Sequence, residues 1–258
     1  MSSRPDLASL EQIARQVATE WGIELGPPFA LARNSYAAPA AAAAAVLKVL
    51  PQDDDESDHD ADALAAWNGD GAVRLLRHDR ERRVLLLERA WPGTDISELP
   101  EYEATAIAVD VGLRLWRPAS EPFRWIGDCV PRWLDEAEGS TEQRNDLILL
   151  ARELYASLDV GRATLVHGDF HHHNILQSDR GYLAIDSKAM LGEPEFDVPS
   201  FLWNPLSYRM KLDVTERRIR AFAEAGLDEE RIRLWAVIRG AYLGVDEDHE
   251  VEILRALI

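Results

Sequence analysis

The chain has 258 residues, of which 47% are hydrophobic, and a formal net charge of −18 at pH 7. Such an acidic composition argues against a nucleic-acid partner, because nucleic-acid binding needs a basic face. Cys129 is the single cysteine, which excludes a disulfide framework and suits a reducing compartment. The polar N-terminus and the lack of an apolar run of about 18 residues predict neither a signal peptide nor a membrane span, so we expect a cytoplasmic protein.

The N-terminal stretch predicts a helix followed by the first strand of a sheet. Apolar residues recur at helical spacing over 6–21, and Asp6 is suited to cap that helix. A break containing glycine and prolines follows at 22–28. The apolar run 29–32 then predicts a short strand, and the residues 33–36 predict a turn after it.

The alanine run at 40–45 could form either a helix or a strand. Helix propensity alone would make it helical. We expect a hairpin turn and a strand instead, because Pro39 stands at its start and the β-like residues 46–50 follow it directly. Lys48 lies inside that strand, where a charge within an apolar run is costly unless it is paired.

The following segments are expected to complete a small antiparallel sheet. Residues 53–62 are rich in acids and predict a solvated loop that leads into a helix over about 59–67. Two further strands are expected at 73–76 and 84–88, joined by a turn at 78–82. The rest of the chain is mainly helical, with helices expected at 101–116, 123–137, 141–158, 215–226, 228–243 and the C-terminus.

Residues 165–188 carry the pattern that points to chemistry. His167-Gly168-Asp169 is followed by Asn174 and, after a predicted hairpin, by Asp186. In kinases an Asp accepts the proton of the attacking hydroxyl, an Asn five residues later holds a metal ion, and a second Asp holds metal against the nucleotide phosphates. Mg²⁺ prefers hard oxygen ligands, which carboxylate and amide groups supply. The order and spacing therefore predict phosphoryl transfer.

Short apolar runs at 165–166, 175–176 and 183–185 flank these polar residues and predict buried strands that hold the loop still. Residues 178–181 have the composition of a turn. The three consecutive histidines 171–173 cannot all face one ion, and no further His or Cys stands at ligand spacing. We therefore expect them in solvent or beside the site, and not in a metal cluster.

Four separated pieces of the chain together resemble the aminoglycoside phosphotransferase family, and within it the streptomycin 6-phosphotransferase or hydroxyurea phosphotransferase branch. These pieces are VLK, HGDFHHHNIL, LAIDSK and GEPEFDVPSFLWNP. The resemblance implies an α+β protein with a two-lobed protein-kinase-like fold. A small N-terminal nucleotide-binding lobe with an antiparallel sheet would span residues 1–90. A larger, mainly helical lobe with the catalytic loop and the acceptor site would span 91–258.

The resemblance also implies roles for individual residues. Asp169 becomes the catalytic base and orienting group, and Asn174 and Asp186 become the ligands of Mg²⁺. Lys48 contacts the phosphates of ATP and pairs with an acid of the following helix. By alignment this acid is Asp60, where the family usually has Glu.

Further residues are implied to contact the nucleotide. Ser35, in the expected loop between the first two strands, is a candidate for phosphate contact, although the loop lacks the usual glycines. Glu56 is the alternative partner of Lys48, because Asp is one methylene shorter than Glu. Lys188 could reach a phosphate or the substrate, or could lie exposed in a turn.

The segment after the fourth strand resembles the hinge of the family. Adenine would donate a hydrogen bond to the Glu88 carbonyl there and accept one from the Ala90 amide. Leu87 would lie behind the adenine. Downstream, Asp197 matches a family position that looks structural and would tie the catalytic loop down through hydrogen bonds.

The implied function is ATP- and Mg²⁺-dependent phosphorylation of a hydroxyl on a streptomycin-like aminoglycoside, and so antibiotic resistance. An acidic cleft built from Glu193, Glu195 and C-terminal acids would favour a cationic acceptor. Two alternatives stay open: a kinase of a sugar or amino-sugar metabolite, and a catalytically inactive nucleotide-binding protein. The altered phosphate loop and Asp60 in place of Glu favour the inactive alternative, whereas the intact kinase-like residues oppose it.

Overall fold

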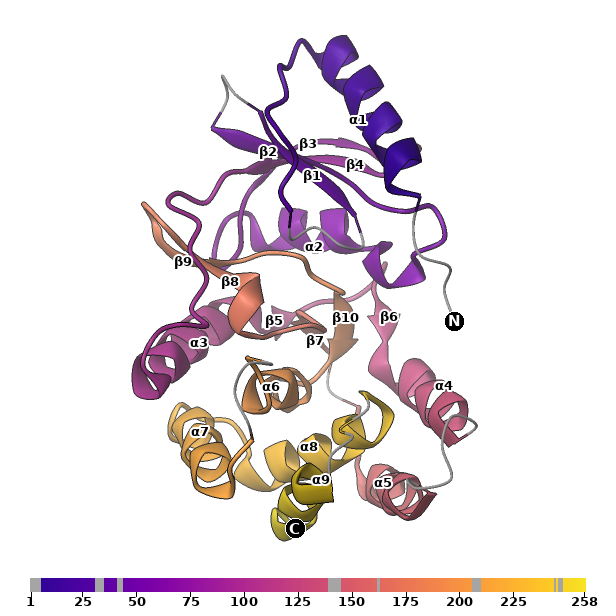
Figure 1. Ribbon diagram of the computed structural model, residues 1–258. Coiled ribbons are helices and arrows are strands. Elements are labelled where there is room, and N and C mark those ends of the chain that lie inside the picture. The colour runs from indigo at the N-terminus through magenta and orange to yellow at the C-terminus, as the bar shows by residue number, and fades with distance from the viewer. Residues whose placement is uncertain are drawn as a thin grey trace. The chain divides into compact units, whose positions relative to one another are not determined.

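The computed structural model describes residues 6–30, 35–40, 44–138, 145–161, 163–205, 210–243, 245 and 248–258. It divides the chain into two compact units (Figure 1). Unit 1 consists of Met1–Thr94 and Leu176–Lys188, and unit 2 of Asp95–Ile175 and Ala189–Ile258. The division after Thr94 differs from the expected one at residue 90, and the segment carrying Asp186 groups with the N-terminal part of the chain.

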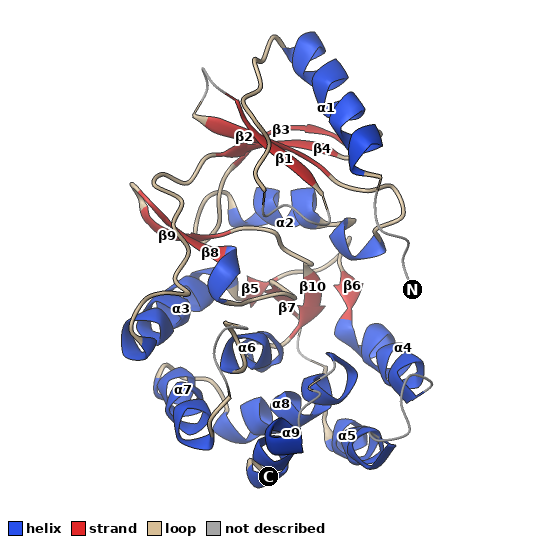
Figure 2. Ribbon diagram, viewed as in Figure 1, coloured by secondary structure: helices blue, strands red, loops and turns tan. Residues whose placement is uncertain are grey.

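Unit 1 is built on an antiparallel sheet with the strand order β1-β2-β4-β3. The helix α1 packs against this sheet and buries Leu10, Ala14 and Val17 in one cluster with Leu47 and other strand residues (Figure 2). Asp6 caps α1, as predicted, because its side chain accepts a hydrogen bond from the Ala8 amide. The elements are α1 (Leu7–Trp21), β1 (Tyr36–Ala40), β2 (Ala45–Val49), β3 (Leu75–Asp79) and β4 (Val84–Glu88).

The alanine run forms strand and hairpin, as the sequence predicted, and not a helix. Ala40 ends β1, Ala45 begins β2 and pairs with it, and Ala44 has a left-handed φ of 45° at the turn. Residues 41–43 lie outside the described part of the chain. Pro39 is accommodated because β1 is an edge strand, where a missing amide donor is tolerated.

The first strand of the sheet was predicted in the wrong place. Phe29 and Ala30 lie in a loop and a turn, while residues 31–34 lie outside the described part. The first strand is β1 instead, in which small and β-compatible residues alternate between buried and half-buried positions. The predicted turn at 33–36 is also displaced, since Tyr36 already pairs with Val49 in the sheet.

Two short helical segments and a hairpin complete unit 1. The 3-10 helix η1 (Asp55–Ser57) and the helix α2 (Asp60–Trp67) follow the acidic loop. The strands β8 (Ile175–Ser178) and β9 (Gly181–Ala184) form a hairpin. The Ser178 hydroxyl donates to the Gly181 carbonyl at 2.7 Å, as expected of turn chemistry.

Unit 2 is mainly helical, with a small sheet of strand order β5-β7-β10-β6. The large side chains of α6 and α8, including Phe196, Phe201 and Trp235, are fully buried and form the centre of its core. The elements are α3 (Glu101–Leu115), β5 (Arg117–Pro118), β6 (Arg124–Trp125), α4 (Ile126–Glu138), α5 (Asn145–Ser157), β7 (Thr164–Val166), the 3-10 helix η3 (His172–Asn174), β10 (Met190–Gly192), α6 (Pro194–Leu202), α7 (Leu212–Glu224), α8 (Glu229–Leu243) and α9 (Asp248–Ala256).

A buried arginine fixes the end of α6. Arg218 of α7 is 2% exposed, and its Nη1 donates to the carbonyls of Phe201 at 2.8 Å, Leu202 at 2.9 Å and Asn204 at 2.8 Å. A cation at a helix C-terminus satisfies carbonyls that lack intrahelical donors. Among the helices described, none is both long enough and apolar enough to cross a membrane.

The burial pattern of the sheet predicts a large contrast between two leucines. Leu47 of β2 is fully buried, whereas Leu76 of β3 is 51% exposed. Leu47→Ala should lower the free energy of unfolding by about 2–5 kcal/mol through lost transfer energy and a cavity. The control Leu76→Ala should change it by less than about 0.5 kcal/mol. Urea unfolding of both variants measures this, and equal losses would contradict the described core.

Candidate active site

In unit 2, the loop that follows β7 is held by Asp197 of α6. Its carboxylate accepts hydrogen bonds from the His167 amide at 2.7 Å, the Gly168 amide at 2.8 Å and the Trp116 indole at 2.9 Å. Asp197 is fully buried. Gly168 has a φ of 82°, which glycine adopts without strain. The predicted structural role of Asp197 is confirmed, and the loop delivers Asp169 in a fixed position.

Asp169 and Asn174 are joined through the backbone of this loop. The Asn174 side-chain amide donates to the Asp169 carbonyl at 2.9 Å. This bond fixes which way the amide points, so its oxygen is the group left to bind a cation. The Asp169 side chain is 30% exposed and can be reached by a substrate.

The three histidines occupy three different environments. His171 lies beside Asp169, with its Nε2 3.5 Å from Oδ1 of that residue. His173 is paired through Nδ1 with Asp95 at 2.9 Å. His172 is buried and stacked on Phe201, with ring centroids 4.0 Å apart, so this residue does not lie in solvent, which was one of the two places expected for it. Within the described ranges, no group of three or more His, Cys, Asp and Glu residues is arranged to hold a metal ion.

In unit 1, Lys48 of β2 is the centre of a buried charge cluster. Its Nζ lies 2.9 Å from Oδ2 of Asp60 in α2 and 2.6 Å from Oδ1 of Asp186. The Ser187 hydroxyl donates to the other oxygen of Asp60 at 2.7 Å. Lys48 is 6% exposed and Asp60 is fully buried. The predicted pairing of Lys48 with Asp60 is confirmed, and the shorter side chain spans the distance.

The electrostatics keep Lys48 charged. Burial alone would lower the pKa of its ammonium group, but the charges of Asp186 and Asp60 and their hydrogen bonds outweigh burial and raise the pKa above its ordinary value. Glu56, the alternative partner, lies instead 2.9 Å from Lys188. Lys188 is thereby held by a partially exposed ion pair, with 41% of its side chain accessible.

Asp186 combines a fixed backbone with an accessible carboxylate. Its φ is 61°, in the left-handed region that residues other than glycine rarely adopt. One carboxylate oxygen binds Lys48, yet the side chain is 57% exposed. Strained backbone of this kind is often found at functional sites. The group can therefore bind a further cation without losing its anchor on Lys48.

The residues expected at the hinge lie at the end of β4. Glu88 pairs with Ala45 of β2, and Ala90 follows the strand as a buried residue. The Glu88 carboxylate accepts from Arg180 at 2.7 and 2.8 Å, and this hydrogen-bonded pair lowers the pKa of Glu88. Contacts of the Glu88 carbonyl and the Ala90 amide with adenine stay predictions, as does the place of Leu87 behind it.

Ser35 was expected in the loop between the first two strands, but it does not lie in that hairpin. It directly precedes β1, whereas the hairpin joins Ala40 to Ala45 at the other end of the strand. A five-residue strand spans roughly 17 Å. A phosphate contact of Ser35 stays a prediction, but it no longer has the support of a position in that loop.

Glu193 and Glu195 do not contribute to an acidic cleft, the feature that would have favoured a cationic acceptor. The two residues are 1% and 2% exposed. Glu193 is paired with Arg231 at 2.6 Å and accepts from the Trp235 indole, and Glu195 accepts from the Asp228 amide at 3.0 Å. Buried carboxylates persist when they are paired in this way, so both residues are structural.

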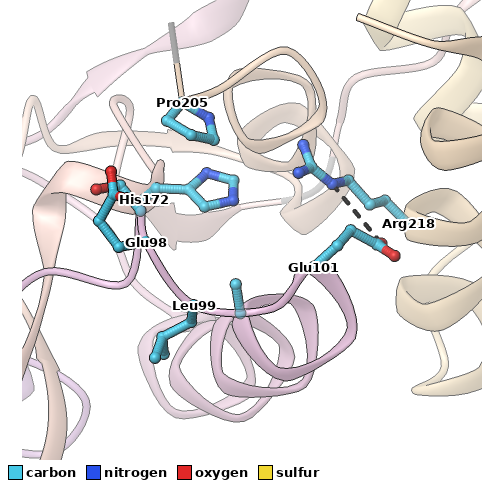
Figure 3. Close-up of a pocket in the computed structure, with 8 residues that line it drawn as sticks. Glu98, Leu99, Glu101, His172, Pro205 and Arg218 are labelled. Carbon is cyan, nitrogen blue, oxygen red and sulfur yellow. Dashed lines mark ion pairs between the residues drawn. The ribbon is translucent and has the colours of Figure 1, made fainter. Parts of the chain in front are cut away.

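Unit 2 has a pocket of about 350 Å³ that is lined in part by His172, in the loop that carries Asp169 and Asn174. Figure 3 shows the His172 imidazole directed into the space between Pro205 and Leu99. Glu101 and Arg218 form an ion pair of 3.9 Å at the other side. The Ile96 amide donates to the His172 carbonyl at 3.4 Å, which ties the pocket wall to the loop. The lining residues are Ser97, Glu98, Leu99, Glu101, Ala104, His172, Pro205 and Arg218.

Comparison with known proteins identifies the class of this fold and site. The structure of a choline/ethanolamine kinase family protein from Mesorhizobium loti superimposes with a TM-score of 0.68 at 14% identity, covering 97% of this chain and 93% of that one. The predicted α+β, kinase-like fold is therefore confirmed. A family model described as aminoglycoside/hydroxyurea antibiotic resistance kinase matches residues 35–249.

Two characterised sequences are similar over most of the chain. The hydroxyurea phosphotransferase of Kitasatospora aureofaciens is 34% identical over 234 residues, which cover 85% of this chain and 67% of that protein. The streptomycin 6-kinase of Streptomyces glaucescens is 33% identical over 212 residues, which cover 74% and 66%. The chain belongs to the aminoglycoside/hydroxyurea antibiotic resistance kinase family. It spans about two thirds of the length of these relatives.

The buried charge cluster predicts a strong dependence of stability on Lys48. Lys48→Met leaves the buried Asp60 carboxylate without its cation, which should cost about 3–5 kcal/mol of unfolding free energy. The double variant Lys48→Met, Asp60→Leu removes both charges and should recover part of the loss. Urea unfolding measures both. A single variant as stable as the wild type would contradict the burial and pairing described.

The position of His172 predicts a pH dependence. Burial, together with the charge of Arg218, lowers its pKa from 6.5 to about 2. Below about pH 6.5 the unfolded chain binds a proton that the folded chain does not, so stability falls as pH falls, by about 1.4 kcal/mol per unit. His172→Phe keeps a ring stacked on Phe201. Its unfolding free energy should lack the part of the pH dependence that His172 causes between about pH 6.5 and 4.5. Urea unfolding at several pH values measures this. Identical slopes of unfolding free energy against pH in the wild type and His172→Phe would refute the predicted contribution of His172.

Proposed function

We propose that this protein transfers the γ-phosphoryl group of ATP to a hydroxyl of a small molecule, with a streptomycin-like aminoglycoside as the first candidate. The observation that carries the proposal is the Lys48 cluster. A lysine buried between an acid of the following helix and the Asp after the β8–β9 hairpin is the arrangement that kinases use to hold nucleotide phosphates. Family membership supports the same reaction class.

In this proposal Asp169 is the residue that acts on the acceptor hydroxyl. Asp169 accepts the proton of the acceptor hydroxyl as its oxygen attacks the γ-phosphorus, and ADP leaves with the electrons of the broken bond. Asp169 is suited to this role because Asp197 fixes its loop and its own carboxylate remains accessible. Catalysis then rests mainly on positioning and charge.

Asp186 and Asn174 are the residues proposed to hold Mg²⁺. Their available atoms are a carboxylate oxygen and an amide oxygen, which are the hard donors that this ion prefers. When bound, Mg²⁺ supplies positive charge that neutralises the phosphates. Lys48 supplies a further fixed positive charge to the same phosphates.

The remaining nucleotide contacts follow from position. Glu88 and Ala90 offer a backbone carbonyl and amide to adenine at the end of β4. Lys188 is paired with Glu56, and its ammonium group has further N–H donors that could contact a phosphate. A phosphate contact of Ser35 is also proposed, and of these nucleotide contacts it has the least support from its position. The need for ATP and the single cysteine both suit action in the cytoplasm.

The acceptor is proposed to be cationic. The net charge of −18 favours it, and the pocket beside the catalytic loop offers Glu98 and Glu101, which replace the buried Glu193 and Glu195 as candidate contacts. The similarity to a hydroxyurea phosphotransferase makes hydroxyurea a second candidate acceptor. The alternative, a kinase of a sugar or amino-sugar metabolite, would use the same residues for phosphoryl transfer, but its acceptor pocket would bind a sugar.

An inactive nucleotide-binding protein is the alternative of another class. The sequence arguments for it were the altered phosphate loop and the replacement of Glu by Asp60. The second argument loses force, because Asp60 reaches Lys48 at 2.9 Å and is also held by Ser187. Binding of ATP without turnover of any acceptor would favour this alternative.

Removing the proposed base should abolish most of the activity. Asp169→Ala should lower kcat by about 10²–10⁴-fold, since a positioned base is lost. The control Asp110→Ala removes an exposed carboxylate of α3, paired only with Arg114 among the interactions seen there, and should leave activity unchanged. ADP release coupled to a reporter enzyme measures this with streptomycin, hydroxyurea, amino sugars and simple sugars.

The pattern of turnover separates the candidates. Turnover of streptomycin that vanishes in Asp169→Ala supports an aminoglycoside kinase, and turnover of a sugar alone supports a metabolic kinase. Full activity of Asp169→Ala would contradict the proposed mechanism. Absence of turnover, with ATP still raising the melting temperature, would favour the inactive protein.

A further inference from the structure

We propose that His171 is a positioning residue that holds the carboxylate of Asp169 toward the acceptor hydroxyl. The proposal rests on the function proposed above and adds a residue to it. His171 lies two positions after Asp169 in a run of three histidines. Of these three, it alone is placed within reach of both Asp169 and Asn174 among the contacts of the described loop.

The hydrogen bonds of the loop determine which nitrogen of His171 carries the proton. The His173 amide donates to Nδ1 of His171 at 3.3 Å. A ring nitrogen that accepts a hydrogen bond carries no proton, so the proton of the neutral ring is on Nε2. His171 therefore presents an N–H donor on the side of the ring that faces Asp169 and Asn174.

The orientation of Asn174 leaves Asp169 as the acceptor of this donor. Nε2 of His171 is 3.3 Å from the Asn174 side-chain nitrogen and 3.5 Å from Oδ1 of Asp169. The Asn174 nitrogen is itself a donor, bound to the Asp169 carbonyl at 2.9 Å. Two donors cannot bond each other, whereas a carboxylate oxygen accepts. The Asp169 carboxylate oxygen, 3.5 Å away, is therefore the acceptor that we assign to the Nε2–H group.

This contact gives the base an orientation that its backbone alone does not. Asp197 holds the backbone amides of His167 and Gly168, whereas rotation about the side-chain bonds of Asp169 is restricted by contacts of its carboxylate. A donor at one carboxylate oxygen restricts that rotation and directs the other oxygen away from the ring. Contacts of 3.5 Å without substrate often shorten when substrate binds. The His171 side chain is 18% exposed, which shields the contact from water.

Two substitutions separate this role from a structural one. The amide of Asn occupies the place of Nδ1, so His171→Asn can keep the bond from the His173 amide but loses the donor toward Asp169. The amide of Gln occupies the place of Nε2, so His171→Gln keeps that donor and loses the other bond. We expect His171→Asn to lower kcat by about 10–10²-fold with KM for ATP unchanged, and His171→Gln to stay within about threefold of wild type.

The control is His173→Asn, which lies in the same run but has its ring paired to Asp95; it should stay within about threefold. The assay uses ATP with streptomycin, and Asp169→Ala in parallel. An inactive Asp169→Ala together with a fully active His171→Asn would overturn the role of His171 alone. A fully active Asp169→Ala would overturn the proposed function. A loss in His171→Gln equal to that in His171→Asn would indicate a merely structural residue and also overturn the inference.

A spectroscopic measurement tests the geometry without turnover. Two-bond ¹⁵N–¹H correlation spectra of the wild-type protein, assigned with His171→Gln, report which ring nitrogen is protonated. The expected result is a proton on Nε2 and a shift of that signal in Asp169→Asn. A proton on Nδ1, or no response to Asp169→Asn, would overturn the proposal even if the assay shows no turnover.

Discussion

The structure of unit 1 depends on one buried carboxylate. Asp60 binds Lys48 with one oxygen and Ser187 with the other, and so joins α2, β2 and the segment after β9. Because a buried charge is costly unless it is paired and hydrogen-bonded, neither oxygen can lose its partner cheaply. The same network binds Asp186 through Lys48 and leaves its carboxylate accessible. The bonds that stabilise this part of the unit therefore also place the charges that phosphates require.

In unit 2 another buried acid, Asp197, holds the polar loop that follows β7 in place. Asp197 satisfies two loop amides and an indole, so a loop of polar residues can keep one conformation inside a helical core. Arg239 adds to this by donating to the Gly168 carbonyl at 3.0 Å. Backbone groups of a buried loop need such partners, because water cannot reach them. The loop that carries Asp169 and Asn174 is thereby held in place.

The sequence predicted the parts of the structure that depend on local pattern or on the motif. The helical periodicities, the alanine-rich hairpin, the Lys48–Asp60 pair and the role of Asp197 were all available from it. The rest depends on which distant residues meet. Ser187 reaches Asp60 across 127 positions, and Glu193 meets Arg231 across 38, with no local signal for either contact. His172 belongs to the core because Phe201 offers a ring to stack on, which a run of histidines does not reveal.

The central claim is that the γ-phosphoryl group moves from ATP to a hydroxyl of a small molecule. ³¹P NMR of the protein with ATP, Mg²⁺ and streptomycin tests it most directly, because it identifies the phosphorus compounds formed. We expect the γ-phosphate resonance to decline while ADP and a new phosphomonoester of streptomycin appear in equal amounts. Inorganic phosphate as the sole new product besides ADP would contradict transfer to this acceptor, and the same result with hydroxyurea and sugars would contradict the account as a whole.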